Sequence, residues 1–205
     1  DAYASLAVVS FDLLGVLDGV NSQGLTVALL ADDELSELGK VRPSGGVQAG
    51  FDVLQVGRFL LDTCKDVPAA EAALRGAKLY YASIPCHYLV ADASGRSFVW
   101  ENAIDLSGGH VIEGDGGPQV TTNYLQHLHP DPQALPADAN PQGLFGRQKT
   151  LLARFVEQET FSMDEIRANA SCVAAAAPSG AGFPPNRTLW HALYFPAERR
   201  MEIDF

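Results

Sequence analysis

The sequence is poor in basic residues and contains no long apolar run. Only 14 residues are Lys or Arg, against 25 Asp and Glu, so the formal charge is −11. A protein that binds the phosphate backbone of nucleic acids or an anionic lipid surface needs a basic face, and this balance argues against both. No stretch approaches the roughly 18 apolar residues that a membrane-spanning helix needs. We therefore expect neither nucleic acid nor membrane as a partner.

Cysteine is also scarce, and the usual cofactor motifs are missing. The three cysteines, Cys64, Cys86 and Cys172, show no CxxC spacing, which argues against a disulfide scaffold or a structural zinc site. We expect them to be buried or inert thiols. The chain has no phosphate-binding loop, no GxGxxG turn, no HExxH helix and no GxSxG elbow. The sequence therefore predicts no cofactor and no metal.

Two local clusters invite a chemical interpretation that their spacing does not support. His127 and His129 could form a metal site with Asp131, but they lie in a proline-rich loop without helical spacing, so we interpret them as solvated loop histidines. Cys86 beside His87 looks like a nucleophile and its base. Adjacent residues of a strand point to opposite faces, so these two side chains are not expected to meet.

Hydropathy and turn chemistry predict strands and helices in alternating groups. Asp66 is the expected N-cap of one helix, and Ser162 with Glu165 forms a capping box for another. The expected strands are 6–17, 25–30, 79–83, 87–92, 97–101, 110–113, 119–122, 188–195 and 201–205. The expected helices are 49–64, 68–75, 144–158 and 163–176, with turns at 18–24, 93–96, 114–117 and 196–199 and long loops over 31–48 and 125–143.

The order of these elements indicates an α+β fold rather than a parallel α/β sheet. Helices come in pairs and strands in antiparallel hairpins, whereas a doubly wound sheet alternates strand and helix. The pattern fits two antiparallel sheets stacked face to face, with a helix pair over each outer side. We expect a single domain over residues 1–205.

Polar residues at the ends of these elements are the best candidates for a functional site, because such groups can line a cleft on a rigid support. Asp18 and Asn21 flank the first turn, Asn123 and Tyr124 begin the long loop, and Arg147 lies at the start of a helix. Other roles stay open for three of them: a left-handed turn residue for Asn21, an Asx turn for Asn123 and an exposed helix end for Arg147.

Five segments, taken in order, resemble the N-terminal-nucleophile (Ntn) amide hydrolases related to choloylglycine hydrolase and penicillin V acylase. The similarity is strongest to the branch of acyl-coenzyme A:6-aminopenicillanic acid acyltransferase. The segments resemble the family's DGxNExGL turn, its LLxxC…EAxxxL helices, its HFLxADxxGxxxVxE hairpin, its TN loop and its TLWxxxY strand. In this sequence they are 17–25, 59–74, 87–101, 122–124 and 188–194.

This resemblance implies a four-layer αββα sandwich and an enzyme that hydrolyses a linear amide or transfers its acyl group. The nucleophile would be an N-terminal Cys whose own α-amine is the base. Asn123 would donate to the oxyanion, and Arg147 would stabilise the nucleophile site. Asp18, Asn21 and Tyr124 are the expected substrate-binding residues. The partner would be a small amide or acyl substrate.

The sequence departs from the family at its beginning. The family's nucleophile Cys and a following Asp lie upstream of every matched segment, and this chain opens at Asp1 in an apolar context. We expect the chain to be the C-terminal portion of such an enzyme, incomplete at its N-terminus. Its partner would be the missing N-terminal segment or chain. The sequence leaves open whether it also forms a homo-oligomer. Ala31 stands where the bile-salt branch has Asn, which argues against bile-salt specificity. Two alternatives remain: a degenerate, non-catalytic binding or structural subunit, and an unrelated α+β domain.

Overall fold

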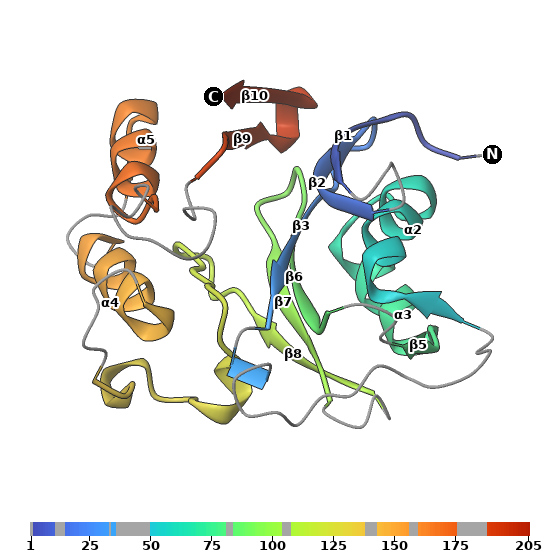
Figure 1. Ribbon diagram of the computed structural model, residues 1–205. Helices are drawn as coiled ribbons and strands as arrows, with labels where there is room; N and C mark the ends of the chain where they lie inside the picture. Colours follow the sequence, from blue (N-terminus) through green and yellow to red (C-terminus); the bar gives the residue numbers. More distant parts are fainter. Residues whose placement is uncertain are drawn as a thin grey trace.

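The computed structural model contains one large antiparallel sheet with helices on both sides (Figure 1). The structure describes residues 2–10, 15–32, 34–35, 50–80, 84–103, 108–137, 143–155, 160–175 and 188–205. Six strands follow the spatial order β1-β2-β3-β6-β7-β8, each antiparallel to its neighbours. They are β1 (Ser5–Ser10), β2 (Gly15–Asn21), β3 (Thr26–Ala31), β6 (Cys86–Ala91), β7 (Ser97–Asn102) and β8 (Gly109–Glu113).

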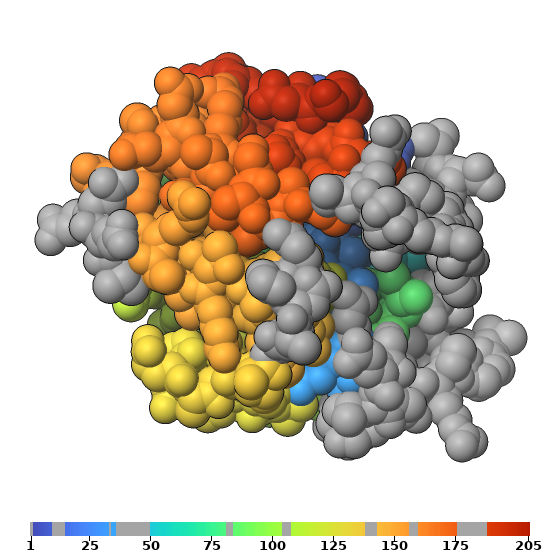
Figure 2. Space-filling model, turned by 60° about the vertical axis from the view of Figure 1, so that its left-hand side comes forward, coloured from blue at the N-terminus to red at the C-terminus, as the bar shows by residue number. Residues whose placement is uncertain are grey.

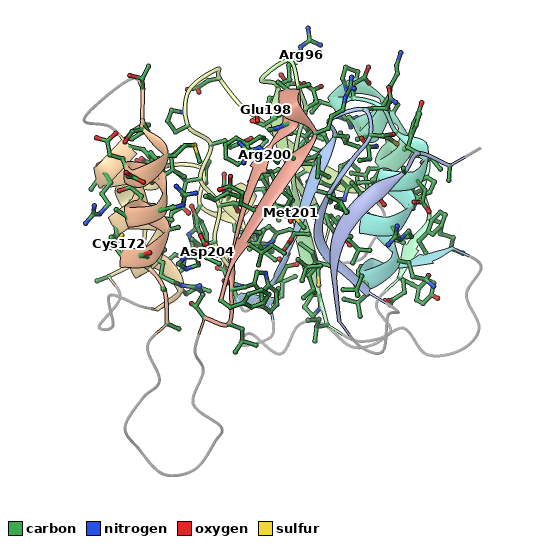
Figure 3. The ribbon with its side chains drawn as sticks, turned by 90° about the horizontal axis from the view of Figure 1, so that it is seen from above. Arg96, Cys172, Glu198, Arg200, Met201 and Asp204 are labelled. Atoms are coloured by element: carbon green, nitrogen blue, oxygen red, sulfur yellow. The ribbon has the colours of Figure 1, made fainter. Side chains whose placement is uncertain are left out.

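The remaining elements are arranged in layers on the two faces of this sheet. They are β4 (Phe51–Asp52), η1 (Val53–Gln55), α2 (Val56–Thr63), α3 (Val67–Gly76), β5 (Leu79–Tyr80), η2 (Gln126–Leu128), η3 (Pro132–Ala134), α4 (Leu144–Phe155), α5 (Met163–Cys172), β9 (His191–Phe195), η4 (Pro196–Glu198) and β10 (Arg200–Asp204). Seen from above, α2 and α3 cover one face, the β9–β10 hairpin lies over the other, and α5 lies beyond the hairpin (Figure 3). Within the described ranges, no helix has the length and apolar character to cross a membrane.

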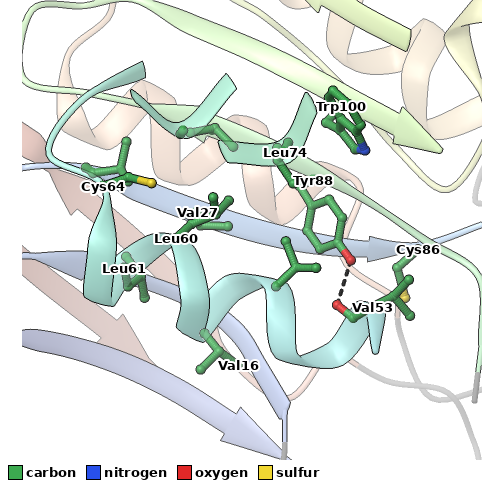
Figure 4. Packing of buried hydrophobic residues seen from close by; sticks show 14 of the residues in the cluster. Val16, Val27, Val53, Leu60, Leu61, Cys64, Leu74, Cys86, Tyr88 and Trp100 are labelled. Atoms are coloured by element: carbon green, nitrogen blue, oxygen red, sulfur yellow. Dashed lines mark hydrogen bonds between the residues drawn. The ribbon is translucent and has the colours of Figure 1, made fainter. Parts of the chain in front are cut away.

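The main core lies between the sheet and the pair α2 and α3. Leu60 and Leu61 of α2 pack with Val27, Tyr88 and Trp100 of the sheet, and all five side chains are almost fully buried (Figure 4). Each such burial contributes about 1.5–3 kcal/mol to folding. The Tyr88 hydroxyl donates to the carbonyl of Val53 at 2.6 Å, which satisfies the one polar atom of that ring.

Several local expectations are confirmed. The Asp66 side chain accepts from the Ala69 N–H at 2.9 Å and begins α3, and Ser162 with Glu165 forms the reciprocal capping box of α5. The hairpins β6–β7 and β9–β10 pair in the expected regions. Cys86 packs in the core beneath the helices, whereas the neighbouring His87 belongs to the opposite face, as strand alternation predicts.

The predicted first strand was wrong in its extent. The run 6–17 contains two antiparallel strands, β1 and β2, and the expected turn at 18–24 begins only after Asn21. Gly19 explains the difference: a Cβ there would lie 2.7 Å from the carbonyl oxygen of Leu6, so the glycine permits close strand packing rather than a turn.

The predicted pairing of 110–113 with 119–122 was also wrong. β8 pairs with β7 instead, with Val111 opposite Trp100, and residues 114–122 form no strand. Gln119 contacts β8 through its side chain, whose Nε2 donates to the carbonyl of Ile112 at 2.8 Å. The expected loops over 31–48 and 125–143 lie partly outside the described residues, and the helix end at 156–158 lies wholly outside them.

Candidate active site

The face of the sheet opposite α2 and α3 carries buried polar side chains. Tyr88 and Trp100 point to the helices, so the alternation of β6 and β7 directs His87 and Glu101 to the other face. Both side chains are fully buried. We call this surface the inner face, because the β9–β10 hairpin, α4 and the loop 113–137 cover it. In Figure 2 that loop (yellow) lies beside α4 (light orange) on the molecular surface.

Asn123 and Arg147 come together at this face. The guanidinium Nη2 of Arg147 donates to the Oδ1 of Asn123 at 2.8 Å. The Nδ2 of Asn123 donates to the carbonyl of Ala31, at the end of β3, at 2.9 Å. Since Oδ1 faces a donor and Nδ2 faces an acceptor, the orientation of the amide is defined by its two partners. The resemblance had implied a site role for both residues, and the structure places them in contact.

Hydrogen bonds between the loop and α4 hold this pair in place. The hydroxyl of Thr122 donates to the carbonyl of Leu144 at 3.2 Å, at the first residue of α4. The Nε2 of Gln148 donates to the carbonyl of Val120 at 3.0 Å. The residues on either side of Arg147 thus bind the residues just before Asn123. As a result, the first turn of α4 and the loop behave as one support for the two side chains.

This arrangement can bind a negatively charged oxygen. The Asn123 amide has two N–H groups, and only one is needed for the carbonyl of Ala31. The Nε of Arg147 is buried and has no hydrogen-bond partner among the described residues. An amide N–H beside a guanidinium is a suitable donor set for an oxyanion, because both groups are fixed before the charge develops.

Three histidines pair with three carboxylates along the same face. His87 Nδ1 forms a short hydrogen bond with Asp32, and both side chains are fully buried. His127 Nδ1 donates to Glu101 at 2.7 Å, and His129 Nε2 to Glu34 at 2.6 Å. The expectation that the loop histidines are solvated was therefore wrong for two residues, because buried carboxylates on the sheet side attract them.

Two of these carboxylates, Glu101 and Glu34, fasten the loop. Besides His127, Glu101 accepts from the backbone N–H of Gln126 at 2.6 Å, and Glu34 accepts from that of Leu125 at 3.0 Å. Among the described residues, no group of three His, Cys, Asp or Glu side chains is arranged to hold a metal ion. The carboxylate oxygens are occupied by loop donors, which orders the segment that carries Asn123.

Asp18 lies on the inner face of β2, under the β9–β10 hairpin. Its carboxylate accepts a short hydrogen bond from the hydroxyl of Tyr194, which is 176 residues away, and a second from Trp190. Burial raises the pKa of the Asp18 carboxyl above its usual value, although both hydrogen bonds act in the opposite direction. The same burial, with the Asp18 charge, raises the pKa of Tyr194. Asp18 is thus a half-buried contact point for the C-terminal hairpin.

Asn21 is not brought to the Asn123–Arg147 pair. Its side chain is 2% exposed and points to α2, where Nδ2 donates to the carbonyls of Leu61 and Cys64 at 2.9 and 2.7 Å. Its Oδ1 accepts from the N–H groups of Gln23 and Leu25, both at 3.0 Å. All hydrogen-bonding positions of the amide are used by backbone, so the geometry assigns Asn21 to the turn rather than to a substrate.

Tyr124 follows Asn123, but its ring packs in an aromatic cluster. It packs edge-on to Phe145 with ring centroids 5.3 Å apart and lies 5.9 Å from the ring of His129. Burial and the charges of Glu101 and Glu34 raise the pKa of Tyr124 to about 12, so the phenol stays protonated at neutral pH. The ring borders a cavity of about 370 Å³, which also touches Gln148.

The sequence alone did not identify the buried acidic partners, Asp32, Glu34 and Glu101. Asp32 directly follows the apolar strand β3, and Glu101 interrupts the apolar strand β7. A charged residue inside or at the end of an otherwise apolar strand could have indicated these buried pairs, since such a residue is buried only when it has a partner. The identity of the partners required the tertiary structure.

The fold is shared with solved structures of two hydrolases. Two variant forms of conjugated bile acid hydrolase from Clostridium perfringens superpose with TM-scores of 0.66 and 0.64, each at 16% identity, over 93% of this chain and 70% of theirs. Penicillin V acylase from Agrobacterium tumefaciens gives a TM-score of 0.62 at 19% identity, over 93% of this chain and 62% of its own. No family model and no curated protein sequence matches the chain. The chain therefore shares the overall fold of these hydrolases, which confirms the α+β fold class that the sequence predicted.

Proposed function

We propose that this chain supplies the oxyanion-binding part of an enzyme that cleaves a linear carbon–nitrogen amide bond, or transfers its acyl group, with an N-terminal Cys nucleophile located outside the chain. The observation that carries the proposal is the Asn123–Arg147 pair, held at 2.8 Å between the sheet and α4. Solved structures with the same fold are named as a bile acid hydrolase and a penicillin acylase, which supports the amide class.

The chain's own cysteines are poorly placed to be the nucleophile. Cys64 and Cys86 are buried in the core beneath α2 and α3, on the far side of the sheet from Asn123. Burial raises the pKa of the Cys64 thiol, which disfavours the reactive thiolate. Cys172 lies on α5, where its thiol contacts the carbonyl of Asn169. These three positions are what we expect if the nucleophile belongs to a segment outside this chain.

A groove on the inner face offers room for such a segment. Two cavities of about 380 and 390 Å³ both touch Leu89 and Gln119; one extends to His191 of β9 and the other to Pro196. Among the described strands, β9 pairs only with β10, so its second edge is open to another strand. We place the nucleophile-bearing segment here, beside residues 119–121, which lead directly to Asn123. Backbone pairing along β9 would hold it.

The reaction follows from these groups. The α-amine of the terminal Cys takes the proton of its own thiol, and the thiolate attacks the amide carbon. The carbonyl oxygen becomes negative and accepts from the free N–H of Asn123. The C–N bond breaks as the ammonium returns its proton to the leaving amine, which leaves a thioester. Attack by water then completes hydrolysis, and attack by a second amine completes acyl transfer.

A second candidate is a non-catalytic binding or structural subunit with a degenerate site. It is favoured by one observation, that the described residues place no cysteine at the Asn123–Arg147 pair. This candidate keeps the fold and the polar site but predicts no turnover. It also predicts that replacing Asn123 changes binding alone.

Turnover by the protein expressed from its complete gene separates the two candidates. We expect release of amine from an N-acyl amide panel that includes penicillin V and a glycine-conjugated bile acid, and loss of that release in Asn123→Ala. Arg154→Ala is the matched control, because Arg154 also lies on α4 and also binds an asparagine, Asn169, at 3.1 Å. A folded protein that releases no amine from any member of the panel would support the non-catalytic subunit.

A further inference from the structure

We infer that His87, held by Asp32, is a positioning residue for Asn123, acting through the hydroxyl of Thr121. The inference rests on the proposed function, in which the amide of Asn123 must face a developing oxyanion. The link from His87 and Asp32 to Asn123 runs through the neighbouring residues Ala31 and Thr121. Their effect is carried by the chain segments on both sides of that amide.

The first step is the buried pair itself. Asp32 follows the last residue of β3, and its backbone N–H donates to the carbonyl of Pro85 at 2.9 Å, just before β6. His87 lies on β6 opposite Leu30 of β3. Its Nδ1 bonds the Asp32 carboxylate, and both side chains are fully buried. A buried carboxylate bonded to a histidine nitrogen fixes the plane of the imidazole ring.

The second step connects the ring to the loop. The Nε2 of His87 lies 3.2 Å from the hydroxyl oxygen of Thr121, two residues before Asn123. This contact joins β6 to the loop whichever of the two atoms donates, and the Thr121 hydroxyl also lies 3.5 Å from the carbonyl oxygen of Thr122. The contact therefore ties the backbone at Thr121 to β6.

The third step closes the arrangement around Asn123. The amide Nδ2 donates to the carbonyl of Ala31, the residue directly before Asp32. On its other side the chain runs back through Thr122 to Thr121, which is bound to His87. Two of the links that hold Asn123, at Ala31 and at Thr121, thus lead to the same Asp32–His87 pair, and Arg147 supplies another. A shift of that pair would move the acceptor of the amide and the backbone that carries it.

Three successive loop residues bind three different elements. Thr121 binds β6 through His87, Thr122 binds the start of α4 through the carbonyl of Leu144, and Asn123 binds the end of β3 and Arg147. Such a segment has little freedom to rotate. A preorganised donor gains its catalytic effect from this lack of freedom, and a misplacement of about 1 Å can cost about 10²-fold in rate.

Thr121→Val is the variant that tests the inference, because it removes the hydroxyl and keeps the size and shape of the side chain. Thr26→Val is the matched control. Thr26 is a buried threonine on the same sheet, and its hydroxyl donates to the carbonyl of Ala91 at 3.1 Å, away from residues 121–123. Thr121→Ser restores the hydroxyl and should rescue the wild-type behaviour. His87→Gln is a second probe with a different donor and acceptor arrangement.

The readout is the side-chain amide pair of Asn123 in a ¹H–¹⁵N spectrum of the full protein, assigned by its loss in Asn123→Asp. In Thr121→Val and in His87→Gln we expect both signals to shift, with hydrogen exchange faster by about tenfold, the effect of losing one hydrogen bond. In Thr26→Val and Thr121→Ser we expect neither change. In the enzyme assay, kcat of Thr121→Val should fall by up to about 10²-fold with KM unchanged.

Each outcome decides one of the two claims. If the Asn123 signals of Thr121→Val and His87→Gln match those of Thr26→Val, the positioning role is overturned. A normal kcat in Thr121→Val overturns it as well. If the signals respond but the wild-type protein cleaves no amide, the positional link between His87 and Asn123 stands and the proposed function fails.

Discussion

Arg147 donates to the Oδ1 of Asn123 at 2.8 Å, and this contact determines which end of the amide faces the sheet. With the oxygen turned to the guanidinium, the nitrogen is left to donate to the carbonyl of Ala31 and to one further acceptor. Arg147 therefore has two effects at the site. It supplies positive charge, and it orients the neighbouring amide; under the proposed function, this is the orientation that the oxyanion requires.

Removal of the amide should abolish most of the turnover. Asn123→Ala deletes the proposed oxyanion donor, and losing one such donor costs about 10²–10³-fold in kcat. The fold should persist, because the residue is only half-buried. Steady-state kinetics together with a circular dichroism melting curve check both parts. Turnover within threefold of the wild type would remove Asn123 from the site.

Replacement of Arg147 should show whether charge or geometry dominates. Arg147→Lys keeps the charge but cannot present the planar guanidinium, so we expect a large loss of kcat in Arg147→Lys as well as in Arg147→Ala. Arg154→Ala on the same helix should keep near-normal kcat. Full activity in Arg147→Lys would mean that the charge alone suffices and that orientation of the amide matters little.

Asn21 should matter for stability rather than for substrate. Asn21→Ala leaves two carbonyls and two N–H groups of a buried turn without their partner, which we expect to lower the free energy of unfolding by about 2–4 kcal/mol. Ser22→Ala, in the same turn, is the control and should lie within about 0.5 kcal/mol of the wild type. Urea denaturation measures both. An unchanged midpoint for Asn21→Ala, with KM raised, would restore the substrate-binding role.

Asp92 should make stability depend on pH in the acid range. Burial would raise its pKa, but hydrogen bonds from Ser94 and from the backbone of Val67, Ser94 and Arg96 outweigh burial and lower it. Because the folded pKa lies below the unfolded value of about 3.9, this contribution is present above that value and is lost as the pH falls through the folded pKa.

Asp92→Asn should therefore be less stable than the wild type at pH 7, and the difference should shrink as the pH falls below about 4. Urea denaturation at a series of pH values provides the measurement. Glu113→Gln, at an exposed carboxylate, is the control and should follow the wild type. A difference between Asp92→Asn and the wild type that stays constant down to pH 2 would contradict this account.

The sequence predicted the local structure that local chemistry determines. The N-cap Asp66, the capping box of Ser162 with Glu165, and the two hairpins whose strands follow one another closely were all found from spacing alone. The run 6–17 was misread as one strand because an apolar pattern contains no sign of where a strand reverses. In the structure Gly19 packs inside a strand, although glycine is more often found in turns.

The site was predictable only in part, because its contacts are long-range. Asn123 and Arg147 were identified through motif resemblance, and the structure supplied their contact. The pairing of Asp32 with His87 spans 55 residues, and that of Asp18 with Tyr194 spans 176. No local pattern specifies such pairs, since the topology of the sheet brings them together.

Mass spectrometry of the full protein after reaction with a β-lactam or N-acyl amide probe tests the central claim most directly. We predict a covalent acyl adduct on an N-terminal Cys that lies outside these 205 residues, and no adduct in Asn123→Ala. An adduct on Cys64, Cys86 or Cys172, or the absence of any adduct in a folded protein of verified mass, would contradict the account.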